Sequence, residues 1–291
     1  MNRTPLTLLY VPGDRPPVVA KALEAGADVV VIDLEDAVAP DRKDYARAAT
    51  ADLLADARPT VPVHGAVHVP VHVPVHVPVR VPIHVRVNAL DSPWAAADLA
   101  ALAALPGLAG LRLPKVTGPD EIRRVAGAAR VPLYALLETA LGIEHAYAIA
   151  TAHPSLRGIA LGEADLRADL GVRADAGLDW PRSRVIVAAR AAGLAPPPQS
   201  VHPDIRDLDG LAASCAHGRA LGFLGRAALH PRQLPVIERA YLPTPAEIEH
   251  AETVLEAAAV HEGAQALPGG HFVDTAVVAL ARRTLSLARR T

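Results

Sequence analysis

The chain has 291 residues, 51% of them hydrophobic and 3% aromatic, with a formal net charge of −2. This length suits one large barrel or two ordinary domains, and the near-neutral charge argues against general binding to nucleic acid or to a membrane surface. A single cysteine, Cys215, excludes an internal disulfide framework and fits a cytoplasmic protein. We expect no signal peptide and no transmembrane segment, because the first residues carry neither pattern.

Short apolar segments alternate with alanine-rich amphipathic segments along most of the chain. The apolar segments predict strands, and the segments between them predict connecting helices. The predicted strands are 6–11, 29–34, 84–87, 110–113, 131–137, 157–161, 198–201 and 222–225, and the predicted helices are 17–26, 41–57, 94–105, 119–129, 142–151, 182–192, 208–221 and 245–262. Eight consecutive strand–helix units within about 250 residues predict an α/β fold of the (β/α)8 TIM-barrel type.

An open doubly wound sheet is the alternative to a barrel for this alternating pattern. Polar residues stand at the ends of many different strands, whereas an open sheet would gather them at one switch point. In addition, no strand is followed by a Rossmann glycine fingerprint. We therefore predict a barrel domain over residues 1–245 and a helical C-terminal extension over residues 246–291.

A His-Val-Pro-Val repeat fills residues 60–82. Its regularly spaced prolines exclude a helix and leave an edge strand, an extended arm or a disordered insertion without a catalytic part. His68, His72 and His76 recur in it, but four residues of strand span about 13 Å. A metal ion needs each nitrogen at about 2 Å, so we expect no metal site within one extended arm.

Two carboxylates follow consecutive predicted strands, Glu138 after the fifth and Asp165 after the sixth. They could be helix caps or surface acids. However, consecutive units of a barrel are neighbours around one mouth, and Asp33, Glu35 and Asp36 add negative charge at the same end. Because such a cluster repels itself without a cation, we predict that Glu138 and Asp165 hold one hard divalent ion such as Mg²⁺.

Two arginines are candidates for binding an anionic substrate. Arg86 lies in a valine-rich strand, where an unpaired charge would be costly. It could pair with the acids of the barrel or clamp a substrate carboxylate with two hydrogen bonds. Arg15 follows the first strand in a turn, which suits a phosphate or carboxylate contact but equally an ordinary surface arginine.

Seven motifs occur in a fixed order along the chain. They are VPGDRP at 11–16, DLEDAV at 33–38, VRVN at 85–88, LPK at 113–115, LET at 137–139, GEADL at 162–166 and LHPRQL at 229–234. Each is weak alone, but together they resemble the citrate lyase beta subunit-like proteins, within the superfamily of HpcH/HpaI aldolases, citrate lyases and malyl-CoA lyases. The resemblance covers residues 6 to about 285, without the repeat.

The resemblance implies a Mg²⁺-dependent barrel enzyme, usually a homotrimer. Such an enzyme cleaves or forms a carbon–carbon bond between a CoA thioester and a 2-oxo acid, with citryl-, malyl- or citramalyl-CoA as substrate types. By this resemblance, Glu138 and Asp165 look like the Mg²⁺ ligands. Arg86 looks like the clamp on the carboxylate of the oxo acid and takes part in catalysis.

Four further residues take roles from the same resemblance. Arg15 looks like a contact to the CoA end of the substrate, and Glu35 and Asp36 look like acids near the metal on the substrate-binding side. Residues 268–274 resemble the family's C-terminal lid, in which an aspartate, here Asp274, reaches into a neighbouring subunit's site and could act as the catalytic base. The alternative for Asp274 is an N-cap of a helix over 275–288.

Two other functions stay open at this point. The segment 162–171 resembles class II pyruvate aldolases acting on free hydroxy-oxo acids equally well. A non-catalytic or complex-bound citrate lyase beta subunit would carry the same motifs.

Overall fold

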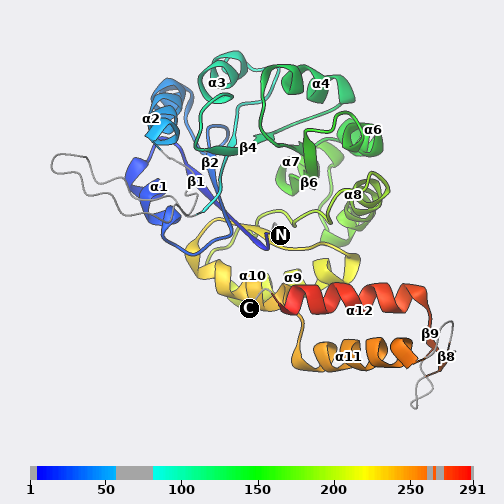
Figure 1. Cartoon of the computed structure of the whole chain (residues 1–291). Coiled ribbons are helices and arrows are strands. Elements are labelled where there is room, and N and C mark those ends of the chain that lie inside the picture. The colour runs from blue at the N-terminus through cyan, green and yellow to red at the C-terminus, as the bar shows by residue number, and fades with distance from the viewer. Residues whose placement is uncertain (1–4, 57–80, 261–264, 267–271, 290–291) are drawn as a thin grey trace, which may run out of the picture. The chain divides into compact units, whose positions relative to one another are not determined.

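The computed structural model describes residues 5–56, 81–260, 265–266 and 272–289 (Figure 1). The contacts within the chain divide it into two units, Thr4–Glu238 and Arg239–Thr291. The predicted boundary after residue 245 stays a prediction. The repeat at 60–82 lies outside the described residues except for its last two positions, so its predicted extended conformation and the predicted absence of a metal at His68, His72 and His76 stay predictions.

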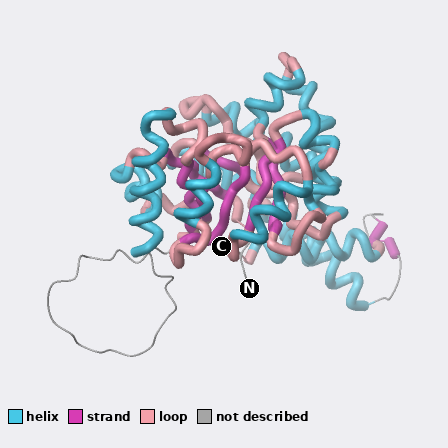
Figure 2. The backbone as a smooth tube through the Cα atoms, turned by 90° about the horizontal axis from the view of Figure 1, so that it is seen from above, coloured by secondary structure: helices cyan, strands magenta, loops and turns pink. Residues whose placement is uncertain are grey.

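The first unit is built on a curled parallel sheet with the strand order β6-β5-β4-β3-β2-β1-β7 (Figure 2). The strands are β1 (Thr7–Pro12), β2 (Val29–Asp33), β3 (Ile83–Arg86), β4 (Leu108–Leu113), β5 (Leu133–Leu137), β6 (Leu156–Leu161) and β7 (Arg226–Ala228). Their residues are mostly buried, as expected when helices cover a parallel sheet. The predicted α/β class with a parallel, barrel-like sheet is thus confirmed.

Helices connect the strands and lie outside them (Figure 1). They are α1 (Pro16–Leu23), α2 (Lys43–Asp56), α3 (Ala95–Leu102), α4 (Pro119–Ala128), α5 (Ala140–Glu144), α6 (Ala146–Ala150), α7 (Glu163–Leu170), α8 (Asp179–Ala191), α9 (Leu208–Leu221) and α10 (Leu234–Tyr241). Two details differ from prediction. The helix expected over 142–151 is divided into α5 and α6, and α7 begins inside the GEADL motif, where a loop was expected.

The last two predicted strands need correction. The strand predicted over 222–225 is wrong, because Gly222 and Gly225 both take positive φ angles, 107° and 82°. Such angles suit glycine and here end helix α9 and turn the chain into β7. The segment 198–201 contributes only an isolated parallel bridge between Gln199 and Arg226. Within the described residues, the main sheet therefore has seven strands.

The second unit contains the helices α11 (Pro245–Val260) and α12 (Thr275–Ala288) and the short antiparallel strands β8 (Gln265–Ala266) and β9 (Phe272–Val273). Its core contains Val254, Val273 and Ala281, with partly buried apolar side chains packed around them. The structure does not test whether this unit acts as a lid. Among all the described helices, none combines the length and the apolar character that crossing a bilayer requires.

Candidate functional site

A cavity of about 580 Å³ opens at the carboxyl ends of the strands of the first unit. Five of the residues predicted for the site line it: Arg15, Asp36, Arg86, Glu138 and Asp165. Residues far apart in the sequence meet here because parallel strands present their carboxyl ends at one rim. The arrangement supports one site in which acids and arginines face the same space.

Glu138 directly follows β5 and is only 1% exposed. Its Oε2 atom has no hydrogen-bond partner within the described residues. Burial raises the pKa of the Glu138 carboxyl group to about 8, and the negative charges of Glu35 and Asp165 add to that shift. A buried carboxylate without a partner is costly, and a cation bound at Oε2 would remove that cost.

Asp165 lies in the first turn of α7, just after Gly162 ends β6. An added Cβ at Gly162 would overlap the Cγ and Oε1 atoms of Glu138. The φ angle of Gly162 is −102°, so the position requires the space of a glycine and not its backbone freedom. The GEADL motif therefore contributes more than Asp165 to the site, because its glycine leaves the space that the Glu138 carboxyl group occupies.

Arg86 is held on the other side of the cavity by a dense ion-pair network. Its Nε and Nη2 atoms donate to the two carboxylate oxygens of Asp33 at 2.8 and 2.7 Å, and its Nη1 atom lies 2.9 Å from Glu35 Oε2. Burial disfavours the charge of Arg86, but the hydrogen bonds to Asp33 and the negative charges of Asp33 and Glu35 together outweigh this and hold its pKa above the ordinary value. Arg86 is therefore a fixed cation, and the ion-pair alternative considered from the sequence is present.

Lys115 completes this network, although the sequence suggested no role for it beyond a polar strand end. Its Nζ atom donates to Glu35 Oε1 at 2.7 Å and lies 3.6 Å from Asp36. Its φ angle of 54° is uncommon for a residue with a side chain, and such angles gather at functional sites. Glu35 is thus gripped by two cations behind the cavity, while burial raises its pKa.

The two remaining predicted residues lie in different surroundings. The Arg15 side chain is 65% exposed at the cavity rim, and its nearest acid is Asp14 at 4.0 Å. Asp274 belongs to the second unit and caps α12, where its Oδ1 atom accepts hydrogen bonds from the backbone of Ala276 and Val277 at 2.9 and 3.0 Å. The capping alternative is therefore observed, and the catalytic role of Asp274 stays a prediction.

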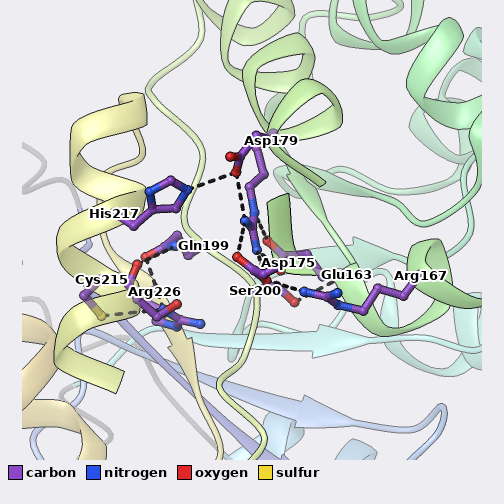
Figure 3. Close-up of polar contacts among 11 residues, drawn as sticks. Glu163, Arg167, Asp175, Asp179, Gln199, Ser200, Cys215, His217 and Arg226 are labelled. Atoms are coloured by element: carbon purple, nitrogen blue, oxygen red, sulfur yellow. Dashed lines mark hydrogen bonds and ion pairs between the residues drawn. The ribbon is translucent and has the colours of Figure 1, made fainter. Parts of the chain in front are cut away.

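A second ion-pair network involves Glu163 of α7, which also lines the cavity (Figure 3). Arg182 donates to both carboxylate oxygens of Glu163 at 3.0 and 2.7 Å and to Asp175 at 2.8 Å. Asp175, Asp179 and His217 could in principle hold a metal ion, since their ligand atoms lie within 4.8 Å of one another. However, the hydrogen bonds from Arg182 lower the pKa of Asp175 to about 2, so this group of acids already has its cation.

Comparison with known proteins identifies the family. A family model described as HpcH/HpaI aldolase/citrate lyase matches residues 6–231. The chain belongs to this family. The family predicted from the seven motifs is confirmed, and with it the prediction of an enzyme of the carbon–carbon lyase class, since HpcH/HpaI and citrate lyase proteins are of that class.

Relatives of this HpcH/HpaI family member carry two kinds of name. A (3S)-malyl-CoA thioesterase of Cereibacter sphaeroides is 35% identical over 97% of this chain and 94% of its own length. The citrate lyase subunit beta of Escherichia coli is 35% identical over 99% of this chain and 94% of its own length. Both relatives extend over both units of the chain.

Solved structures of the family hold ligands. The CitE protein of Mycobacterium tuberculosis, in complex with magnesium, acetoacetate and coenzyme A, is 34% identical, with a TM-score of 0.79 over 99% of this chain and all of that one. A citrate lyase beta subunit from the same organism, complexed with oxaloacetate and magnesium, is 33% identical, with a TM-score of 0.67 over 82% of this chain and 97% of that one.

Proposed function

We propose that this protein is a Mg²⁺-dependent lyase that cleaves a hydroxyacyl-CoA thioester into an acyl-CoA and a 2-oxo acid, or condenses them. One observation carries the proposal. Glu138, a buried acid whose Oε2 atom has no hydrogen-bond partner among the described residues, lies beside Asp165 in a cavity that Arg86 also lines. The magnesium, CoA and oxo acids in the related structures support the same chemistry.

The residues present fit a magnesium ion. Mg²⁺ prefers oxygen ligands and is often held by one or two carboxylates, which Glu138 and Asp165 provide. Burial and neighbouring acids raise the pKa of Glu138 to about 8, so a cation is what would keep this carboxyl group ionised at neutral pH. When bound, the ion would polarise the carbonyl oxygen of the 2-oxo acid as a Lewis acid.

The side chains around the proposed magnesium position would bind the two ends of the substrate. Arg86, held by Asp33 and Glu35, would present its guanidinium to the carboxylate of the oxo acid and stabilise charge that develops there. Arg15, exposed at the rim, would contact the CoA end of the substrate, while Glu35 and Asp36 would hold Arg86 and border the oxo acid.

Asp274 is our candidate for the base, supplied by a neighbouring subunit. In the condensation direction its carboxylate would take a proton from the methyl group of the acyl-CoA, leaving an enolate. The enolate carbon would then attack the carbonyl carbon of the oxo acid and form the new carbon–carbon bond, while the carbonyl oxygen becomes an alkoxide that takes a proton from solvent to give the hydroxyl group. Cleavage reverses these steps and returns the proton from Asp274 to carbon.

The proposed working form is a cytoplasmic homotrimer. In each subunit, residues 1–245 would close into a complete (β/α)8 barrel and residues 246–291 would act as a lid. The parallel bridge between Gln199 and Arg226 supports an additional strand beside β7. Light scattering should give three times the chain mass of 30.4 kDa, and a monomer would contradict both the trimer and the role of Asp274.

Hydrolysis of malyl-CoA is the second candidate, because relatives of comparable identity are named (3S)-malyl-CoA thioesterases. Product analysis separates the two activities. With citryl-CoA, malyl-CoA or citramalyl-CoA and Mg²⁺, we expect a lyase to release acetyl-CoA together with oxaloacetate, glyoxylate or pyruvate, respectively, whereas a thioesterase releases free CoA and the hydroxy acid. Lyase activity that survives complete removal of divalent metal by EDTA would overturn the proposed mechanism.

A further inference from the structure

Arg112 is a second arginine of the cavity wall and was not among the predicted site residues. It lies on β4, where the sheet register pairs it with Arg86 of β3 on one side and with Tyr134 of β5 on the other. Paired residues on neighbouring parallel strands point to the same face, with strands about 4.8 Å apart. Arg112 is 4% exposed and lines the cavity.

The two neighbouring arginines differ in their partners. Arg86 pairs with the carboxylates of Asp33, Glu35 and Asp36. For Arg112, no carboxylate lies within ion-pair distance in the part of the chain that the structure describes, and its Nε atom has no hydrogen-bond partner there. Its guanidinium lies instead 5.0 Å from the ring centroid of Tyr134.

The groups next to Arg112 cannot supply the missing negative charge. The Tyr134 ring offers a cation–π contact, and burial raises the pKa of its hydroxyl group. His84 stacks on Tyr134 at 4.7 Å. Burial lowers the pKa of His84 well below the ordinary value, and the charge of Arg112 lowers it further. Both rings are therefore neutral near pH 7 and leave the positive charge of Arg112 uncompensated.

A buried arginine keeps its charge and is costly without an anion. Its planar fork matches a carboxylate. We propose that Arg112 binds a second carboxylate of the substrate, so that the 2-oxo acid of this enzyme is a dicarboxylic acid. Arg86 takes the carboxylate next to the carbonyl group, and Arg112 takes the one at the other end. This inference rests on the proposed lyase function and narrows its substrate class.

The experiment compares oxaloacetate with pyruvate, which has the same 2-oxo acid core without the second carboxylate. Calorimetry with Mg²⁺ should show the wild-type protein binding oxaloacetate about 10- to 100-fold more tightly than pyruvate, as expected for hydrogen bonds to a charged group. In Arg112→Gln the preference should fall to about threefold or less with pyruvate affinity nearly unchanged, and Arg112→Lys should restore part of it.

Arg123→Gln is the control, because it also removes one positive charge but from an exposed side chain of α4 that does not line the cavity, and it should keep the oxaloacetate preference. The wild-type comparison needs no variant, so a misfolded Arg112→Gln would leave the test intact. Equal affinity of the wild type for both acids, or an equal loss of both in Arg112→Gln, would overturn the role of Arg112 alone. Failure of the wild type to bind either acid in a Mg²⁺-dependent way would overturn the lyase proposal as well.

Discussion

The two sides of the cavity differ in how completely their charges are paired. Next to β2 and β3, Arg86 is matched by Asp33, Glu35 and Asp36 within short distances, and Lys115, which follows β4, reaches Glu35 and Asp36 there. On the side of β4 to β6, Arg112 has no acid within ion-pair distance among the described residues. There the buried Glu138 also has an oxygen without a hydrogen bond.

This difference in charge pairing indicates where in the cavity a metal or substrate is expected to bind. A network that pairs its own charges needs nothing further and can hold a side chain in place, as Asp33 holds Arg86. Buried polar groups without partners are rare in folded proteins, because each costs free energy. We therefore infer that the paired acids hold Arg86 in place to meet one carboxylate of the substrate, while Glu138 and Arg112 meet the metal and the second carboxylate.

Glu138→Gln should give the largest effect. The amide keeps the size of the side chain but loses the charge for the metal, so we expect kcat/KM for whichever of citryl-CoA, malyl-CoA and citramalyl-CoA the wild type cleaves best to fall by at least about 10²- to 10³-fold. Stability should not fall, because the change removes an unpaired buried acid. A parallel thermal unfolding measurement checks this, and a variant with near wild-type activity would refute the metal role of Glu138.

Asp33→Asn tests the side of the cavity on which Arg86 is paired with acids. Removing one partner of a buried ion pair leaves the other charge uncompensated, so the free energy of unfolding should drop by about 3 kcal/mol or more. Denaturant unfolding measures this, with Arg112→Gln as the matched variant on the unpaired side, for which a much smaller drop is expected. If both variants lost equal stability, the contrast between the two sides would be wrong.

Gly162→Ala should weaken Mg²⁺ binding without touching a ligand. The added methyl group would collide with the Glu138 side chain, and displaced support of a metal ligand typically costs about 10- to 100-fold in affinity. Gly127→Ala is the control, since Gly127 lies in α4 with open space around its Cβ position. The control should bind Mg²⁺ normally, and equal affinities in the two variants would contradict the close fit between Gly162 and Glu138.

Asp175→Asn should give the smallest effect. Hydrogen bonds from Arg182 lower the pKa of Asp175 to about 2 in the folded protein, below its value of about 3.9 in the unfolded chain. Asp175 therefore adds stability above about pH 4 that is lost as the pH falls towards 2. The side chain is 63% exposed, so the effect is modest. Unfolding at pH 6 and pH 3 should show a smaller acid loss in the variant, and an unchanged loss would exclude this contribution.

Local pattern predicted much of the fold and part of the site. Periodic apolar segments located the first six strands closely, because a covered parallel strand is apolar throughout. Glu138 and Asp165 follow consecutive strands, and this position predicted that they lie close together at one rim of the sheet. The last strand was missed because two glycines after α9 place a turn where Phe223 and Leu224 resemble a strand.

The missed residues depend on tertiary contacts. Arg112 lies in an ordinary apolar strand, and only the folded protein shows that no acid of the described residues lies within ion-pair distance of it. Lys115 was recognised only as a polar residue at a strand end. Its hydrogen bond to Glu35 joins residues 80 positions apart, so the sequence pattern could not predict it. Gly162 carried no signal of its own, since its importance comes from the space that the Glu138 carboxyl group occupies.

Calorimetric titration of the metal-free protein with Mg²⁺ tests the central claim most directly. We predict one ion bound per chain in the wild type, and a loss of that binding in Glu138→Gln and equally in Asp165→Asn, since both acids are proposed ligands of the same ion. An unchanged single site in either variant would contradict the account.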